Sequence, residues 1–482
     1  MVQGSGHNMT DQAISSHAVP GDSSYDVAII GAGVVGCAAF REFVLAGARC
    51  MLIERDRDII NGASKGNSAI LHTGFDAVPG SIEASCMRDG YRQYLAIRER
   101  LNLPLLSTGA IVIAWTPEEA ARLPEIVARA HANGVTEVRP LTAEEVRVRE
   151  PLVAPDLHGG VLVPGESVID PWSAPLAYVL QGLANGGHVL RGVEVTGGTH
   201  TGVGWLLHTD AGPVRAGVVV NCAGNYGDLV EAIARPSPFR IRPRKGQFVV
   251  FDKPAYRLTN SILLPVPTER TKGVVVTRTA FGNLLVGPTA EDQDERRAAT
   301  VEQATLEQLV AQGSRILPDL ACETVTAVFA GLRPATEFKD YQIEALSERR
   351  WITVGGIRST GLTAALGIAR HARALYEARF GALHLLNDPV WPTVPNLAEE
   401  RPRPYAQPGR TEIVCHCELV TRAEIEAALA GPIPAATLGG LKRRTRCMLG
   451  RCQGFYCTRR VLELMAGRID PGGAMPACKD AA

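Results

Sequence analysis

Cysteines are concentrated near the C-terminus of this 482-residue chain. Five of its eleven cysteines fall within residues 415–457, as CHC at 415–417 and CMLGRCQGFYC at 447–457. In a reducing compartment, thiolates at such close spacings are more often metal ligands than disulfides. Spacing does not separate the pair 447/452 from the pair 452/457, because both read C-x4-C. Spacing leaves an iron–sulfur cluster and a structural zinc site as the two candidates, although C-x2-C pairs are more usual in zinc sites.

A glycine-rich motif near the N-terminus is typical of dinucleotide binding. The stretch YDVAIIGAGVVGCAAFREFVLAGARCMLIERD (25–56) reads as strand, G-x-G-x-x-G turn, helix, strand and acid. Gly31 permits the tight turn, Gly33 lets the backbone approach a pyrophosphate, and Gly36 allows the helix to pack closely on the strand. The free N–H groups at the start of the helix attract phosphates. Glu54 can accept hydrogen bonds from ribose hydroxyls, which favours FAD or NAD.

Three later segments favour FAD over NAD. Residues 62–81 follow the acid of the motif, and residues 219–228 predict a buried strand that ends in a glycine turn. Residues 352–372 predict a strand, a glycine turn and a helix that begins near Leu362. Segments that are far apart in the sequence thus form further glycine turns. Several such turns indicate an extended cofactor that the chain contacts at several points. We find no second G-x-G-x-x-G unit, which a built-in NAD(P)H domain would need.

The chain divides into a large domain, a linker and a small domain. Residues 25–386 alternate apolar β-rich runs with helical stretches, which indicates an α/β fold. Residues 387–409 contain six prolines and predict a semi-extended linker. Residues 410–470 carry the cysteine cluster. This last part predicts one helix that begins at the capping box TRAE (421–424) and another that follows Cys457.

Composition narrows the class of protein. Lys plus Arg and Asp plus Glu both total 50, so nothing points to nucleic acid or a membrane surface as the main partner. The apolar run 27–40 is shorter than the roughly 20 residues that cross a bilayer, so we expect no transmembrane segment. The two ends of the chain, 1–24 and 471–482, are predicted to be disordered tails. Residues 1–24 lack the basic segment followed by an apolar segment that is typical of a signal peptide. We therefore expect a cytoplasmic protein, or one held peripherally at the inner membrane through a partner.

These motifs resemble a known family. GAGVVG, ER and NSAILHTGFDAVPGS (67–81), followed by residues 219–228 and 355–363, are similar to the D-amino-acid-oxidase-like FAD-dependent oxidoreductases. N-S-x-x-x-H-x-G followed by P-G-S resembles the branch of glycerol 3-phosphate dehydrogenases and oxidases and L-2-hydroxyglutarate oxidases. The resemblance implies an α/β fold in which an FAD-binding Rossmann-type domain is interleaved with a mixed β-sheet substrate domain. A small C-terminal helical iron–sulfur domain would follow.

The resemblance also implies which residues contact FAD. The motif glycines Gly31, Gly33 and Gly36 should lie at the phosphates, and Glu54 with Arg55 at the adenosine ribose. The other expected contacts are Val195 near the adenine, Ala223 and Gly224 beside the pyrophosphate, Ser64, Asn67 and Ser68 along the cofactor, and Gly361, Leu362 and Thr363 at the flavin ring.

Oxidation of an alcohol needs a hydride acceptor, which flavin supplies, and a base for the hydroxyl proton. His72 is the candidate base because histidine titrates near neutral pH, and a purely structural histidine is the alternative. Arg333 is the candidate anchor for an anionic substrate, since its forked donors match a carboxylate or phosphate; the alternative is a surface ion pair. Ser359 could donate its hydroxyl to the same anion. In the basic run 240–248 Lys245 is the best candidate for a further contact, although a solvated edge strand explains most of that run.

The C-terminal part resembles the bacterioferritin-associated-ferredoxin-like 2Fe–2S domain. LKRRTRCMLGRCQGFYC (441–457) is similar to its signature, except that Cys447 stands where a small apolar residue is expected. The ligands that this resemblance implies are Cys415, Cys417, Cys452 and Cys457. The other cysteines show no ligand spacing and are interpreted as core or tail residues: Cys37, Cys50, Cys86, Cys222, Cys322 and Cys478.

Flavin and cluster together predict a dehydrogenase. FAD takes two electrons as a hydride from a small anionic hydroxy compound, glycerol 3-phosphate first and L-2-hydroxyglutarate second. The 2Fe–2S cluster passes them on singly to an external acceptor, either a partner protein or a membrane quinone system reached through another subunit. One alternative is an amino- or imino-acid dehydrogenase subunit of the same fold. The other is a non-catalytic electron-transfer subunit whose flavin meets no small substrate.

Overall fold

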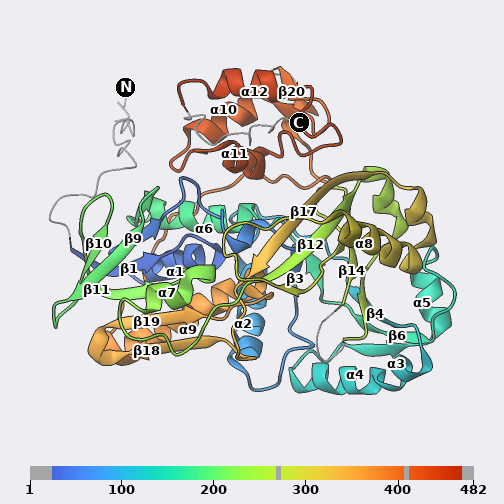
Figure 1. Ribbon diagram of the computed structural model, residues 1–482, viewed down its shortest axis with the longest axis horizontal. Helices are drawn as coiled ribbons and strands as arrows, with labels where there is room; N and C mark the ends of the chain where they lie inside the picture. Colours follow the sequence, from blue (N-terminus) through green and yellow to red (C-terminus); the bar gives the residue numbers. More distant parts are fainter. Residues whose placement is uncertain (1–23, 268–272, 407–411, 469–482) are drawn as a thin grey trace, which may run out of the picture.

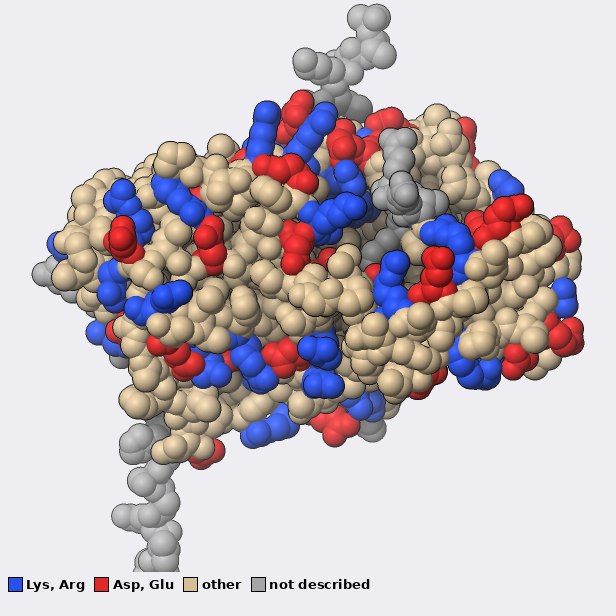
Figure 2. Space-filling view, turned by 90° about the horizontal axis from the view of Figure 1, so that it is seen from below, with Lys and Arg blue, Asp and Glu red and all other residues tan. Residues whose placement is uncertain are grey.

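The computed structural model describes residues 24–267, 273–406 and 412–468. Figure 1 shows two large sheets side by side, each covered by helices, with a small helical domain above them. The predicted tails lie outside the described residues, except Ser24, which begins the first strand. No helix in the described part of the chain is long and apolar enough to cross a membrane. On the face seen in Figure 2, Lys and Arg side chains are interspersed with Asp and Glu.

The first sheet has the topology of a Rossmann-type domain. Its strands lie in the order β18-β19-β11-β1-β2-β8, and neighbours from β19 to β8 are parallel. Val27, Ile29 and Val220 are fully buried, as expected for a parallel sheet that is covered on both faces. An antiparallel ribbon, β9 and β10, extends from β11. The bounds are β1 (Ser24–Ile30), β2 (Cys50–Glu54), β8 (His188–Arg191), β9 (Val195–His200), β10 (Trp205–Thr209), β11 (Val214–Asn221), β18 (Gln342–Leu346) and β19 (Trp351–Gly355).

Helices from distant parts of the chain pack on this sheet as one layer. The helix of the glycine motif, α1 (Val34–Leu45), lies between α6 (Ser173–Ala184) and α9 (Gly361–Phe380), and α9 also packs against α2 (Ile82–Ile97). The close approach of α2 to α9 requires glycine, because a Cβ on Gly90 would lie 2.1 Å from the Thr363 carbonyl oxygen. The start of α9 is thereby fixed against α2.

The second sheet is mixed, as the resemblance implies. β4 and β13 are parallel, and the other neighbours are antiparallel. Its strands are β4 (Ala110–Ala114), β5 (Arg139–Leu141), β6 (Gly159–Val163), β12 (Arg244–Phe251), β13 (Ile262–Pro265), β14 (Val275–Arg278), β15 (Leu284–Gly287), β16 (Glu291–Asp292) and β17 (Val325–Arg333). The helices around it are α3 (Pro117–Ala121), α4 (Leu123–Ala132), α5 (Ala143–Arg149) and α8 (Gln303–Ile316).

The basic run 240–248 does not form a solvated edge strand. Most of it belongs to β12, which pairs with β17 on one side and with β15 and β16 on the other. Lys245 is buried and forms ion pairs with Glu291 (3.0 Å) and Glu302 (2.6 Å). Its charge is therefore neutralised within the sheet.

The two sheets are interleaved along the chain. β1 and β2 belong to the first sheet, β4 to β6 to the second, β8 to β11 to the first, β12 to β17 to the second, and β18 and β19 to the first. The sheets meet where β17 touches the loop after β2. A Cβ on Gly331 would lie 2.1 Å from the Gly66 carbonyl oxygen, so backbone packs directly on backbone there. This contact forms part of the wall of the site described below.

The described part of the proline-rich segment, 387–406, contains no α-helix or strand, yet it is packed on the large domain. Val394 and Leu397 are buried. The Val394 N–H donates to the Leu101 carbonyl (3.2 Å), and the Asn102 side chain donates to the Val394 carbonyl (2.9 Å). The segment is therefore a fixed extended strap.

The C-terminal domain is a small helical unit with its own apolar core. It contains β20 (Ile413–Cys415), β21 (Val420–Thr421), α10 (Arg422–Ala430), α11 (Leu438–Thr445) and α12 (Thr458–Met465). The capping box is present: the Glu424 N–H donates to Thr421 Oγ1 (3.3 Å), and the Thr421 N–H donates to the Glu424 carboxylate (2.8 Å). α11 was not predicted from the sequence; it begins at the N-cap Thr437, in the glycine-containing stretch TLGGL.

A buried carboxylate, Asp58, attaches this domain to the FAD-binding sheet. Asp58 Oδ2 accepts from the Thr437 hydroxyl (2.6 Å) and the Ala436 N–H (3.1 Å). Its Oδ1 accepts from Arg444 (2.8 Å) and lies 3.5 Å from an Arg191 nitrogen. Arg191 in turn donates to the Pro434 carbonyl (2.8 Å). The loop after β2 and the start of α11 are thus joined by charge and by direct hydrogen bonds.

We expect Asp58→Asn to weaken this attachment strongly. The amide keeps the shape of the side chain but leaves two buried guanidinium groups without their counter-charge, which costs about 3–5 kcal/mol. Calorimetry should show the transition that involves the C-terminal domain at a lower temperature. Glu99→Gln, which removes an exposed ion pair with Arg98, is the control and should change little. An unchanged transition in Asp58→Asn would contradict this role.

Candidate active site and cluster site

A cavity of about 810 Å³ is lined by residues of both sheets. Its wall includes the glycine turn after β1, the end of β2, the loop 61–68, the turn after β11, the end of β17 and the start of α9. Ligand pockets usually have about 300–1,000 Å³, so this cavity has room for a large extended ligand. It collects the segments that the sequence marks as cofactor contacts.

The glycine turn has the geometry that a pyrophosphate needs. Gly31 has φ +100°, and a Cβ there would lie 2.6 Å from the Cys222 carbonyl oxygen. Gly33 lines the cavity at the start of α1. A Cβ on Gly36 would lie 1.8 Å from the Gly31 carbonyl oxygen, and Gly36 does not line the cavity. Gly36 therefore packs the helix on the turn, while Gly31 and Gly33 form the cavity wall.

The end of β2 presents a partly buried carboxylate to the same cavity. Glu54 accepts the Ala32 N–H (2.7 Å) and the Asp56 N–H (2.9 Å). Burial raises the pKa of Glu54, although these two N–H groups partly offset that effect. From the following loop, Ser64 Oγ accepts the Val34 N–H (2.9 Å) at the N-terminus of α1. Both side chains line the cavity, where hydroxyl and phosphate groups of a nucleotide could reach them.

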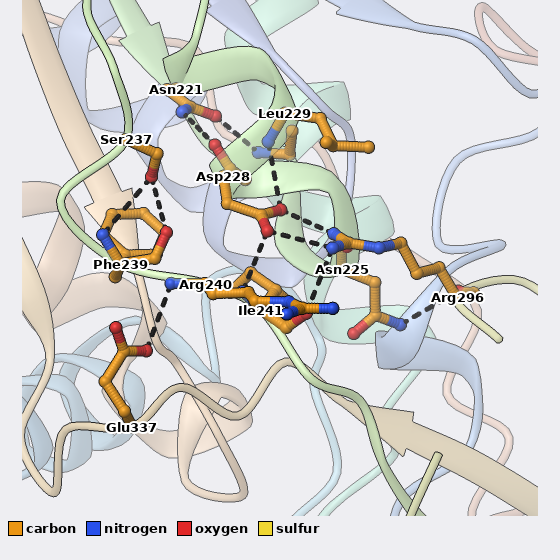
Figure 3. Close-up of polar contacts among 12 residues, drawn as sticks. Asn221, Asn225, Asp228, Leu229, Ser237, Phe239, Arg240, Ile241, Arg296 and Glu337 are labelled. Atoms are coloured by element: carbon orange, nitrogen blue, oxygen red, sulfur yellow. Dashed lines mark hydrogen bonds and ion pairs between the residues drawn. The ribbon is translucent and has the colours of Figure 1, made fainter. Parts of the chain in front are cut away.

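The turn after β11 is held by Arg296, which lies in the loop after β16 (Figure 3). Arg296 donates to Asp228 in α7 (Gly227–Glu231), with an Nη2–Oδ2 distance of 2.9 Å, and to the Asn225 carbonyl (2.7 Å). Arg296 also lines the cavity, as do Ala223 and Gly224 in the turn itself. The ion pair fixes a substrate-domain segment over the predicted pyrophosphate contacts.

His72 forms a hydrogen-bonded dyad with Glu166. Glu166 was not among the site residues predicted from the sequence. His72 Nδ1 lies 2.7 Å from Glu166 Oε2. The other oxygen, Oε1, accepts the Thr73 N–H (2.6 Å) and hydroxyl (2.9 Å), and Glu166 is fully buried. The Nδ1–H donates to the carboxylate, so Nε2 of the cavity-lining His72 is left as a proton acceptor.

Strand pairing explains how the dyad forms. β3 (Ile70–Leu71) and β7 (Ser167–Val168) are antiparallel, with Leu71 opposite Ser167. His72 follows β3 and Glu166 precedes β7, so the two side chains meet although 94 positions separate them. The sequence signal was weak: a single acid in the apolar stretch VLVPGESVI.

Arg333, at the end of β17, is a partly buried positive charge on the cavity wall. Its Nη2 donates to the Thr289 carbonyl (2.9 Å), and no described acidic side chain forms an ion pair with it. Burial, together with the neighbouring Arg244, lowers the pKa of Arg333 to about 10, which leaves it charged at neutral pH. Gly246 makes room for the guanidinium, because a Cβ there would lie 2.3 Å from Arg333 Nη2. This arrangement suits an anionic ligand.

The structure brings most of the sequence-predicted residues together. Thr363 does not line the cavity: its hydroxyl accepts the His72 N–H (2.9 Å) and donates to the Ile70 carbonyl (3.3 Å). Thr363 therefore holds the stretch after β3 against α9. Arg244 and Arg358 also line the cavity and were not predicted. The predicted residues on the wall are Gly31, Gly33, Glu54, Arg55, Ser64, Asn67, Ser68, His72, Val195, Ala223, Gly224, Arg333, Ser359, Gly361 and Leu362.

The five C-terminal cysteines converge at one end of the small domain. The Sγ atoms of Cys415, Cys447 and Cys457 lie within 4.8 Å of one another and are buried. The side chains of Cys417 and Cys452, both partly exposed, contact each other. A hydrogen bond from Cys447 lowers the pKa of Cys415, which favours its thiolate form. A compact set of sulfur donors fits an iron–sulfur cluster.

Comparisons with known proteins agree with both sites. Residues 26–375 match the family described as FAD dependent oxidoreductase, and residues 413–467 match the BFD-like [2Fe-2S] binding domain. The chain is 31% identical over 453 residues to a glycerol 3-phosphate dehydrogenase of Caloramator mitchellensis, with 92% of this chain and 94% of that protein covered. It is 26% identical to an L-2-hydroxyglutarate dehydrogenase of Indibacter alkaliphilus, with 59% and 72% covered.

A solved structure has the same fold as the large domain. The L-alpha-glycerophosphate oxidase of Mycoplasma pneumoniae, solved with FAD bound, is 27% identical to this chain, with a TM-score of 0.73. The match covers 77% of this chain and 99% of the oxidase.

Fold and site together define a flavoprotein oxidoreductase. The glycine turn, Glu54 and the long cavity fit FAD, and the converging thiols fit a 2Fe–2S cluster. The chain belongs to the FAD dependent oxidoreductase family and carries a C-terminal 2Fe–2S domain. It is an enzyme of the glycerol 3-phosphate dehydrogenase-like kind.

We expect Glu166 to act through His72. His72→Asn should slow flavin reduction by substrate about 10²–10⁴-fold, as loss of a general base does. Glu166→Gln should slow it about tenfold or more, because the imidazole loses its orientation, while the KM for substrate changes little. Stopped-flow absorbance under anaerobic conditions measures both rates.

The double variant His72→Asn/Glu166→Gln is the decisive control. If Glu166 acts through His72, the double variant should be no slower than His72→Asn alone. Rates that multiply would show instead that the two residues act independently.

Proposed function

We propose that this protein oxidises glycerol 3-phosphate and passes the electrons through its 2Fe–2S cluster to an external acceptor. The observation that carries the proposal is the partly buried charge of Arg333, without a described acidic partner, on the same cavity wall as the His72–Glu166 dyad. A small substrate with an anionic group and a hydroxyl matches these two features. The relative named glycerol 3-phosphate dehydrogenase, which covers both domains, supports the phosphate over other anions.

In this proposal each residue of the cavity wall has a defined role. Arg333 binds the anionic group, and Ser359 and Arg244 line the cavity with it. His72 takes the hydroxyl proton on Nε2, while Glu166 holds the ring and stabilises its positive charge. The N-terminus of α9 at Gly361 presents the positive end of its dipole to the cavity. FAD, held by the glycine turn and the Glu54 end of the cavity, would supply the hydride acceptor for this oxidation.

L-2-hydroxyglutarate is the second candidate substrate. Arg333 suits a carboxylate as well as a phosphate, and the relative of Indibacter alkaliphilus is named for this substrate. The reaction and the residue roles would be unchanged. We place both reactions in the cytoplasm, with electrons leaving to a partner protein or to a membrane quinone system through another subunit.

An anaerobic titration with glycerol 3-phosphate tests the proposal directly. Flavin absorbance and the EPR signal of the cluster are recorded together. Bleaching of the flavin with a reduced-cluster signal is the expected result. Bleaching by L-2-hydroxyglutarate alone would select the second candidate. Bleaching by an amino acid with ammonia release would indicate the amino-acid dehydrogenase, and no bleaching by any of these would leave an electron-transfer subunit.

Arg333 should set the affinity for substrate. We expect Arg333→Ala to raise the KM by roughly 30- to 1,000-fold, since loss of a buried charged contact costs about 2–4 kcal/mol. Arg333→Lys should be intermediate, because a lysine keeps the charge but not the forked geometry. Steady-state kinetics with an artificial acceptor gives the KM values. Arg242→Ala removes an exposed arginine of the basic run 240–248 that lies off the cavity wall, and it is the control. Equal effects of the two alanine variants would exclude a specific anchor.

A further inference from the structure

The C-terminal domain brings together one more thiol than a 2Fe–2S cluster needs. Such a cluster takes four thiolates, two on each iron. Five cysteine side chains converge here, and they form two groups. Cys417 and Cys452 contact each other on the partly exposed side. Cys415, Cys447 and Cys457 form a buried group in which each thiol contacts the other two.

The fold itself directs Cys447 into the cluster site. α11 ends at Thr445; its C-cap Arg446 has φ +66°, and Met448, on the other side of Cys447, has φ +67°. Arg446 Nε donates to Glu418 Oε2 (2.8 Å), and both side chains are buried. This ion pair ties the residue before Cys447 to the residue after Cys417. The Cys447 thiol is therefore fully buried and fixed beside Cys415 and Cys457.

We propose that the three buried thiols surround one iron and that Cys417 and Cys452 bind the other. In the intact protein Cys415 and Cys457 are the two ligands of the buried iron, and Cys447 is a reserve ligand beside it. When either ligand is lost, the Cys447 thiol gives its proton to solvent and binds the iron as thiolate. No electron is exchanged in this replacement. The exposed iron has no such reserve among the described residues.

This arrangement makes the four ligands unequal. Loss of Cys417 or Cys452 leaves the exposed iron with one thiolate, because Cys447 belongs to the other group. Loss of Cys415 or Cys457 leaves the buried iron with two thiols within reach. The buried iron is thereby protected against loss of a ligand, and the exposed iron is not.

Metal analysis of alanine variants tests the proposal without any substrate. The full-length protein and the variants Cys447→Ala, Cys457→Ala, Cys452→Ala and Cys447→Ala/Cys457→Ala are purified anaerobically. Iron and acid-labile sulfide are measured per bound FAD, which shows that the large domain is folded. EPR of the dithionite-reduced protein reports the ligand environment.

Iron content and EPR should separate the variants clearly. Cys447→Ala should keep its iron and its EPR signal. Cys457→Ala should keep most of its iron with a shifted EPR signal, since a different cysteine now completes the site. Cys452→Ala and the double variant should each retain at least tenfold less iron than Cys457→Ala. Cys415→Ala and Cys417→Ala should repeat the results of Cys457→Ala and Cys452→Ala.

Each other outcome would overturn the proposal. Loss of iron in Cys447→Ala would make Cys447 an obligatory ligand. Equal loss in Cys457→Ala and Cys452→Ala would show that there is no reserve ligand. Equal retention in these two variants would show that the two groups do not correspond to the two irons. These results depend on the cluster alone, so failure of glycerol 3-phosphate as a substrate would not affect them.

Discussion

The buried carboxylate of Asp58 holds the two cofactor sites in one fixed arrangement. Asp58 belongs to the loop after β2, whose neighbouring residues line the FAD cavity, and its oxygens bind the start of α11 and Arg444 in the C-terminal domain. Buried ion pairs add little net stability compared with apolar packing, but they are costly to break. Such a contact therefore fixes the position of the small domain more than it adds to its stability.

Packed side chains continue this contact from the cavity loop to the cluster. The Trp172 indole N–H donates to the Lys65 carbonyl (3.1 Å), and its ring stacks on Phe281 with centroids 5.6 Å apart. The guanidinium of Arg446, the neighbour of Cys447, lies 4.0 Å from the Phe281 ring centroid. The proline-rich strap adds Leu397 to the same apolar group. The separation of flavin and cluster is thus set by side-chain packing and does not depend on the length of the linker.

Local patterns in the sequence predicted the nucleotide end of the site, because residues that are close together in the sequence form that part of the site. The spacing of Gly31, Gly33 and Gly36 required only one strand, one turn and one helix. Glu166 and Asp58 could not be found in this way, because their roles arise from strand pairing and from the docking of another domain. α11 was missed for a related reason: a Cβ on Gly440 would lie 2.1 Å from Asp58 Oδ2, so the glycine that lowers helix propensity is required by that docking.

The run of basic residues around Lys245 led to a different error: the sequence suggested a ligand contact that the fold does not provide. Read along the chain, RIRPRKGQF suggests a cationic surface near the substrate. In the fold, β12 is an inner strand, and its lysine is neutralised by Glu291 and Glu302. Charge in a sequence predicts a ligand contact only where the fold leaves that charge without an internal partner.

This criterion distinguishes Arg333 from the buried arginines that lie at the contact between the large domain and the C-terminal domain. Arg191 and Arg444 share Asp58, and Arg446 is paired with Glu418. Each of these cations is compensated within the chain, as expected, since an uncompensated buried charge costs several kcal/mol. Arg333 has a backbone carbonyl and another arginine as its neighbours, with no described carboxylate. The fold maintains this unfavourable arrangement at a cavity wall, where an anionic substrate would supply the missing charge. The partial desolvation that destabilises the unpaired arginine would therefore strengthen its interaction with a bound anion.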